Sequence, residues 1–136
     1  WSDDRQSLWA AYVIQKDGKN IYFAGDTGYG PVFKLAGELF PSIDAAILPI
    51  GGYEPRDVLG QNHINPEEAV QALLDLNAKI GLGNHWGTIQ LTEEPMDEPP
   101  KRLADAVAKT GLPSDRFRVL QTGESLKLLL PSQVAP

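Results

Sequence analysis

The sequence predicts an α/β protein in which helices cover a sheet in layers. Apolar runs typical of buried strands alternate along the chain with segments whose apolar residues follow helical spacing. An Asp17-Gly18 pair lies between the first two runs and is a strong signal for a β-hairpin. Asp26, His63 and His85 each stand where a predicted strand ends or a predicted helix begins. In layered α/β folds these positions share one edge of the sheet, where functional sites are built.

The first two predicted strands form the hairpin. Residues 8–15 are rich in aromatic and β-branched side chains, and residues 20–25 form the return strand. Both faces of this hairpin are largely apolar, which predicts a buried sheet rather than one with a solvated face. The return strand runs into a glycine-rich loop, residues 25–30. That loop could be an anion-binding nest, but it matches neither a Walker loop nor a dinucleotide fingerprint.

A helix, a strand and a long loop are predicted next. The helix covers residues 31–40, with proline at its first turn, where the missing N–H costs nothing. Residues 44–50 read as a second buried strand, and residues 51–62 as a loop long enough to be functional. The apolar stripe expected to face the core from the helix consists of Val32, Leu35, Ala36, Leu39 and Phe40.

The second predicted helix has the clearest start in the chain. It covers residues 65–77, with Asn65 as N-cap, Pro66 at the first position, and Glu67 and Glu68 in the first turn. These two acids are most simply explained by the helix dipole. The residues expected to face the core are Ala69, Val70, Leu73, Leu74 and Leu76.

The remaining elements complete the α/β pattern. A third strand is predicted at residues 79–84 and leads directly into His85. An irregular acidic, proline-rich loop covers residues 88–100, and a helix follows at residues 101–110, stopped by glycine and proline. Two closing strands are expected at residues 116–121 and 125–130, and residues 131–136 read as a tail.

Composition excludes several classes of function. The net charge is −6 and the isoelectric point is near 4.8, which argues against nonspecific binding to nucleic acid. Cysteine is absent, so disulfides and thiolate metal sites are excluded, which fits a cytoplasmic protein. Residues 1–136 are expected to form a single partial domain, because the chain begins at Trp1 without an initiating methionine and is expected to come from a longer protein.

Asp26, His63 and His85 are the leading candidates for chemistry. Taken singly, each has a structural explanation: Asp26 as a cap on the following loop, His63 as a residue packed near a helix start, and His85 as a core histidine. Together they favour a shared site. If each had only a structural role, three unrelated roles would have to fall by chance at the same edge of the sheet. A catalytic zinc ion needs about three protein ligands and a water, so this chain could supply part of a two-metal site.

Other polar residues have open interpretations. Tyr53 and Arg56 could contact an anionic substrate, or they could be an ordinary loop tyrosine and a surface arginine. Trp86 could be a core residue or a wall of the site. The acidic loop residues expected to be solvated are Glu93, Glu94, Asp97 and Glu98.

Four segments in this order closely resemble the metallo-β-lactamase superfamily, and within it the branch of the N-acyl-phosphatidylethanolamine-hydrolysing phospholipase D and its bacterial relatives. The segments are Phe23-Ala24-Gly25-Asp26-Thr27-Gly28-Tyr29, Pro49-Ile50-Gly51-Gly52-Tyr53-Glu54-Pro55-Arg56, His63-Ile64-Asn65-Pro66-Glu67-Glu68-Ala69 and His85-Trp86-Gly87-Thr88. The resemblance covers residues 8–112. It implies a four-layer αββα sandwich with two zinc ions at one edge, of which this chain looks like the C-terminal half: one mixed sheet flanked by helices.

The resemblance also implies roles for individual residues. Asp26 matches the carboxylate that bridges the two zinc ions, and His85 matches the terminal histidine ligand of one of them. His63 matches a histidine thought to assist at the substrate phosphate. The loop from Tyr53 to Arg56 would border the substrate cleft.

The function implied is part of a zinc-dependent phosphodiesterase that uses a metal-bridging hydroxide on a small or phospholipid-like phosphodiester. The alternatives are a lactonase or other ester hydrolase on the same fold, or a half-domain that binds a partner without catalysis. The family's His-x-His-x-Asp-His motif is absent from the sequence. The expected partner is therefore the N-terminal half of the same domain, or a second copy of the chain, covering the exposed apolar face.

Overall fold

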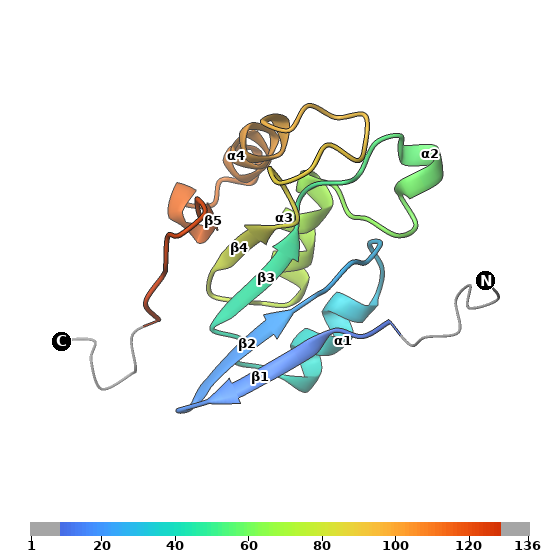
Figure 1. The fold of residues 1–136 in the computed structure, drawn as a ribbon. Helices are drawn as coiled ribbons and strands as arrows, with labels where there is room; N and C mark the ends of the chain where they lie inside the picture. Colours follow the sequence, from blue (N-terminus) through green and yellow to red (C-terminus); the bar gives the residue numbers. More distant parts are fainter. Residues whose placement is uncertain (1–8, 129–136) are drawn as a thin grey trace.

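The computed structural model describes residues 9–128, which form one mixed five-stranded sheet with helices packed on it (Figure 1). The strands lie in chain order across the sheet: β1 (Tyr12–Lys16), β2 (Lys19–Phe23), β3 (Ala45–Pro49), β4 (Gly81–Asn84) and β5 (Phe117–Val119). The first pair is antiparallel and the other three pairs are parallel. The predicted tail, residues 131–136, lies outside the described residues.

The hairpin between β1 and β2 confirms the turn prediction. Lys16 pairs with Lys19 across the turn, and Asp17 and Gly18 both adopt positive φ values, 50° and 72°. Positive φ at both central residues is what a two-residue hairpin turn of type I′ requires, and Asp-Gly meets that requirement at low cost.

Helices cover one face of the sheet. The helices α1 (Val32–Leu39) and α3 (Pro66–Asp75) lie on this face, and α4 (Glu98–Thr110) packs on α3, followed by a 3₁₀ turn at Ser114–Arg116. The single turn α2 (Arg56–Leu59) belongs to the loop that follows β3. In Figure 1, α1 and α3 lie behind the sheet, and α3 packs against α1, β3 and α4. One core cluster joins the sheet to these helices, with Tyr22 and Leu48 from the sheet and Phe33, Leu73 and Leu103 from the helices.

The N-terminus of α3 confirms the capping prediction. The side chain of Asn65 accepts from the Glu68 amide at 2.8 Å, and the Glu68 carboxylate accepts from the Asn65 amide at 2.9 Å. This capping box fixes the start of the helix, and therefore the path of the loop that precedes it. Leu74, predicted to face the core, is instead 39% exposed, whereas Leu73 and Leu76 are buried as expected.

The apolar stripe predicted for α1 is only partly right: Ala36 and Phe40 pack against the core, but the two leucines do not. Leu35 and Leu39 are 55% and 75% exposed, and the residue that enters the core is Phe33. Its ring lies edge-on to Tyr22 at 6.3 Å and stacks on Tyr29 at 5.9 Å. Because the helix spans only eight residues, contact with these two rings decides its rotation.

The predicted burial of the hairpin is confirmed on the face that carries Tyr22, which is 3% exposed, and is wrong on the opposite face. Trp9, Tyr12 and Ile14 are 64%, 61% and 53% exposed. β1 is an edge strand, and the face of the sheet turned away from α1 and α3 carries no helix among residues 9–128 (Figure 1). Apolar side chains on that face therefore remain open to solvent.

Several elements differ from the sequence-based expectation, some by more than a shift of their ends. The loop at residues 51–62 contains α2, and α4 begins three residues earlier than expected, at Glu98. Proline is tolerated in the first turn of a helix, so Pro99 and Pro100 do not prevent this start. The first closing strand shortens to β5, and residues 125–128 of the second are not a strand. Within the described part of the chain, no helix combines the length and apolarity needed to cross a membrane.

Candidate metal centre

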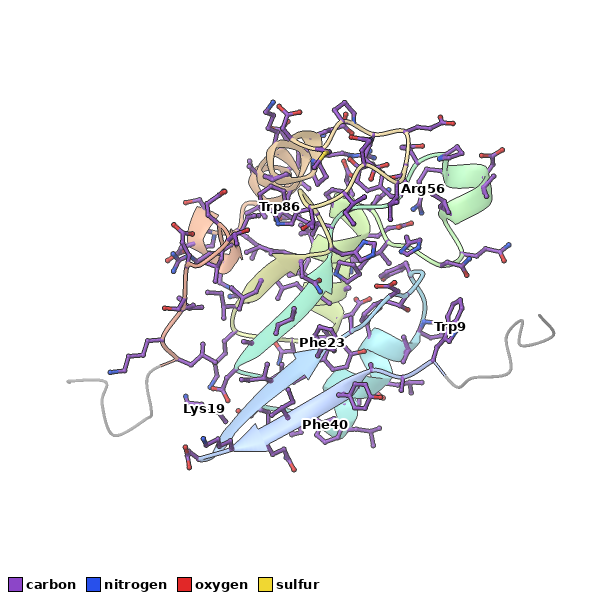
Figure 2. All side chains as sticks on the ribbon, viewed as in Figure 1. Trp9, Lys19, Phe23, Phe40, Arg56 and Trp86 are labelled. Carbon is purple, nitrogen blue, oxygen red and sulfur yellow. The ribbon has the colours of Figure 1, made fainter. Side chains whose placement is uncertain are left out.

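The candidate site lies at the carboxyl ends of the parallel strands. Asp26 follows β2, Gly51 and Gly52 follow β3, His85 follows β4, and His63 precedes α3. Figure 2 shows Arg56 and Trp86 at this end of the molecule and Lys19 at the opposite end. The topology therefore gathers loops from four separate parts of the chain, as expected for this edge of an α/β sheet.

Asp26, His63 and His85 meet there. Each offers one ligand atom, and the three atoms lie within 4.8 Å of one another. His85 Nε2 is 3.5 Å from Asp26 Oδ1, and the two imidazole rings are stacked with their centroids 5.2 Å apart. The three residues singled out from the sequence thus share one cluster, and His63 is as close to it as the two predicted ligands.

The ring of His85 is held in one orientation. Its Nδ1 lies 3.1 Å from the carbonyl oxygen of Gly51. A carbonyl oxygen only accepts hydrogen bonds, so Nδ1 is the donor in this contact, and Nε2 is the ring nitrogen left beside Asp26 for a metal ion. A partner on the far ring nitrogen is the usual way in which proteins orient a histidine that binds metal.

His63 is fixed through its backbone. Arg56 Nη1 donates to the His63 carbonyl at 2.7 Å, while Arg56 Nη2 donates to both carboxylate oxygens of Glu68 at 2.8 Å. The next residue, Ile64, donates its amide to the carbonyl of Thr27 at 2.9 Å, which ties this loop to the loop of Asp26.

The His63 ring is neutral near pH 7. Burial lowers its pKa below the ordinary value of 6.5, and the neighbouring His85 lowers it further. Its Nδ1 is buried and has no hydrogen-bond partner among the described residues. A buried ring nitrogen without a partner is costly, so this one is available to a ligand or a water molecule.

The donor set fits a metal ion. One carboxylate and two imidazoles are ligand types that suit zinc and similar divalent transition metals. The Asp26 side chain is 61% exposed, so its charge faces outward rather than into the core. Three ligands meet the protein's share of a single catalytic zinc site, and a two-metal site requires more than the described residues supply.

Two hollows adjoin the cluster. One, of about 550 Å³, lies beside Asp26 and His63 and is bordered by Trp9. The other, of about 260 Å³, is lined by all three cluster residues and by the segment that follows His85. Its apolar lining includes Trp86, Ile89, Leu91 and Met96. Trp86 is half-buried against the core, so it serves both as a core residue and as a wall.

Tyr53 does not border the cleft, contrary to the prediction. Its side chain is fully buried, its hydroxyl donates to Glu98 at 2.7 Å, and Arg102 lies 4.9 Å above its ring. Burial, followed by the hydrogen bond to Glu98, raises the pKa of Tyr53 well above its ordinary value. The guanidinium of Arg56 is engaged by Glu68 and the His63 carbonyl, and a substrate contact for it stays a prediction.

The acidic loop is not uniformly solvated. Glu94 is 6% exposed and accepts hydrogen bonds from backbone amides of the loop that follows β3. Glu98 belongs to α4, whereas Glu93 and Asp97 are exposed as expected. Sequence reasoning missed Glu94 because a glutamate among other acids and prolines carries no local sign of burial.

Comparison with known proteins places this arrangement in a family. Residues 1–86 match the family model described as the beta-lactamase superfamily domain. N-acyl-phosphatidylethanolamine-hydrolyzing phospholipase D 1 of Caenorhabditis elegans is 37% identical over 126 residues, covering 90% of this chain and 35% of that protein. A UPF0173 metal-dependent hydrolase of Listeria innocua is 35% identical over 116 residues, covering 85% of this chain and 43% of that protein.

A solved structure agrees with the sequence relatives. Igni18, described as a novel metallo hydrolase from the archaeon Ignicoccus hospitalis, superposes with a TM-score of 0.69 at 26% identity, over 93% of this chain and 48% of that one. The chain thus spans between about a third and a half of the length of these relatives. With its mixed sheet, its flanking helices and its matching family model, the chain belongs to the metallo-β-lactamase superfamily.

Proposed function

We propose that this chain supplies part of the zinc centre of a hydrolase that cleaves a phosphodiester. The observation that carries the proposal is the convergence of Asp26, His63 and His85, with ligand atoms within 4.8 Å of one another at the carboxyl ends of the strands. The oriented ring of His85, whose Nε2 lies 3.5 Å from Asp26 Oδ1, supports a ligand role over a purely structural one.

Asp26 and His85 would hold the metal, and Asp26 would bridge two ions if a second is present. Bound zinc supplies Lewis acidity to a water molecule and to phosphoryl oxygens. His63, neutral at pH 7, would donate a hydrogen bond to the substrate phosphate or the leaving oxygen. Arg56 keeps the His63 backbone in place through the carbonyl contact at 2.7 Å.

A phospholipid-like substrate is supported by the segment beside the cluster. Ile89 and Leu91 are 68% and 80% exposed, and both line the smaller hollow together with the three cluster residues. Apolar side chains grouped beside a polar site suit a substrate that has a charged head and an apolar remainder. The relative from Caenorhabditis elegans, named as a phospholipase D, supports the same class.

We further propose that another segment of the same protein supplies the remaining metal ligands and covers the open face of the sheet. Support comes from the exposed Trp9, Tyr12 and Ile14 and from the partial coverage of every relative described above. The alternative is that a second copy of the chain covers the open face of the sheet. Light scattering on the full protein separates the two, since only the second requires a dimer.

The test is made in the full protein with Asp26→Ala, His85→Ala and the control Asp105→Ala, which changes an exposed carboxylate on α4. We expect the two site variants to lose bound zinc and hydrolysis of bis(p-nitrophenyl) phosphate, and the control to keep both. An Asp26→Ala protein with normal zinc content and turnover would refute the proposal. A wild-type protein that cleaves lactones or simple esters but no phosphodiester would refute the substrate class and leave the metal centre standing.

His63→Ala separates its role from that of the ligands. We expect turnover to fall while zinc is retained. Loss of zinc would instead assign His63 as a ligand, which its position in the cluster also allows.

A further inference from the structure

A buried carboxylate lies behind the loop that orients His85. The Glu94 side chain is 6% exposed. Its Oε1 accepts from the amides of Gly52 and Tyr53 at 2.5 and 3.3 Å, and its Oε2 accepts from the amide of Glu54 at 3.1 Å. Three consecutive amides of the loop that follows β3 therefore converge on one side chain that is about forty positions away in sequence.

The segment that carries Glu94 is itself clamped to the same loop. The Glu93 amide donates to the Glu54 carbonyl at 3.3 Å, and Gln90 Nε2 donates to the carbonyls of Thr92 and Glu94 at 2.6 and 2.8 Å. Burial raises the pKa of Glu94, but hydrogen bonds from the surrounding amides and Thr92 outweigh burial and keep it below its ordinary value. The carboxylate is thus charged at neutral pH, and both of its oxygens accept hydrogen bonds from the loop that follows β3.

The other side of this loop touches the His85 ring. The Gly51 carbonyl faces His85 Nδ1 at 3.1 Å. Gly52 has a φ of +78°, and a Cβ there would lie 3.0 Å from His85 Cε1. The peptide between Gly51 and Gly52 therefore carries the carbonyl that orients His85 at one end and the amide held by Glu94 at the other.

We infer that Glu94 is a positioning residue for His85: by holding the Gly52 amide, its buried carboxylate fixes the Gly51 carbonyl that selects the Nδ1–H tautomer and aims Nε2 at the metal site. The identity of the group that Nε2 meets rests on the proposed function, whereas the link from Glu94 to the His85 tautomer does not.

The decisive variant is Glu94→Gln. A glutamine has only one side-chain oxygen, and its NH₂ group is a donor. If the NH₂ group faces the Glu54 amide, the hydrogen bond from that amide is lost. If it faces the amides of Gly52 and Tyr53, the hydrogen bonds from those two amides are lost. The matched control is Glu93→Gln, which removes the same charge from the exposed neighbouring residue. Leu103→Ala, which opens a cavity in the distant core contact of α4, controls for general loss of stability.

The measurement is the pair of imidazole ¹⁵N chemical shifts of His85 in the full protein, freed of metal by chelation and labelled at histidine. We expect Nδ1 of His85 to carry a proton throughout in wild type, Glu93→Gln and Leu103→Ala, whatever the protonation of Nε2 beside Asp26, and Glu94→Gln to show a mixture of molecules with and without the Nδ1 proton. A folded Glu94→Gln with the wild-type tautomer would overturn the inference, as would a mixture in Leu103→Ala. If Glu94→Gln does not fold, Glu94→Asp decides by the same criterion, because its shorter carboxylate cannot reach all three amides.

Titration with zinc alone adds a second readout. We expect the zinc affinity of Glu94→Gln to fall about tenfold or more, in the range usual for loss of a group that orients a metal-binding histidine. Zinc affinity equal to wild type in a variant with mixed tautomers would overturn the part of the inference that concerns the metal. If wild type binds no zinc while its tautomer still depends on Glu94, the proposed metal centre fails and the positioning of His85 stands.

Discussion

Alanine in place of Gly52 would add one methyl group against the His85 ring. The new Cβ would lie 3.0 Å from His85 Cε1 and 3.3 Å from Nδ1, closer than ordinary carbon contacts. The ring would have to move by a few tenths of an ångström away from the new Cβ, which would disturb its contact with the Gly51 carbonyl. The φ of +78° at Gly52 adds backbone strain of about 1–2 kcal/mol for any residue with a Cβ.

Gly111→Ala separates these two effects. Gly111 has nearly the same φ, +73°, and a Cβ there meets nothing within 4 Å. We expect both variants to lower the free energy of unfolding in urea titrations, by about 1–2 kcal/mol for Gly111→Ala and by at least as much for Gly52→Ala, because both place a Cβ at positive φ. Only Gly52→Ala should also lose zinc affinity, by about tenfold, because only there does the ligand ring move.

Two outcomes would refute this reasoning. If both alanine variants bind zinc as wild type does, the contact between Gly52 and His85 does not control the ligand. If Gly111→Ala loses as much zinc affinity as Gly52→Ala, the loss follows from general destabilisation.

Three further predictions concern stability and the His63 loop. Burial raises the pKa of Asp44, but hydrogen bonds from two lysines and a backbone amide lower it from 3.8 to about 2. Above pH 4 the ionised carboxylate should therefore add about 2 kcal/mol to the free energy of unfolding, and this contribution should be lost as the pH falls towards 2. Urea unfolding at several pH values should show that loss in wild type and not in Asp44→Asn. Arg56→Ala should lower turnover with zinc content unchanged, because it releases the His63 carbonyl; loss of zinc would contradict this role. Phe33→Ala should lower the free energy of unfolding by about 3–5 kcal/mol, whereas Leu39→Ala, at a residue 75% exposed, should change it by no more than about 0.5 kcal/mol. Equal losses of stability in thermal unfolding would contradict the observed rotation of α1.

Features set by neighbouring residues were predictable from the sequence. The Asp17-Gly18 turn and the capping box of Asn65 and Glu68 depend on backbone and side-chain contacts within a few positions, and the structure has both. The grouping of Asp26, His63 and His85 was predictable for a related reason: strand order places the ends of parallel strands at one edge, and the sequence places these residues there.

Only the tertiary structure decided which side of an element faces the core and which distant residues meet. In α1, Phe33 is buried in place of Leu35 and Leu39, and it contacts the rings of Tyr22 and Tyr29 from other parts of the chain. Tyr53 lies in the core rather than in the cleft, and Glu98 of α4 accepts a hydrogen bond from its hydroxyl.

Glu94 is the clearest case of this dependence. The sequence by itself determined the local elements and the edge at which the site lies, because those follow from periodicity, caps and turns. Glu94 is buried because it accepts hydrogen bonds from three amides of a loop about forty positions earlier in the sequence. No pattern among its neighbouring residues indicates this long-range contact. A charged side chain is exposed by default, and only a complete set of donors brought by the fold makes its burial favourable.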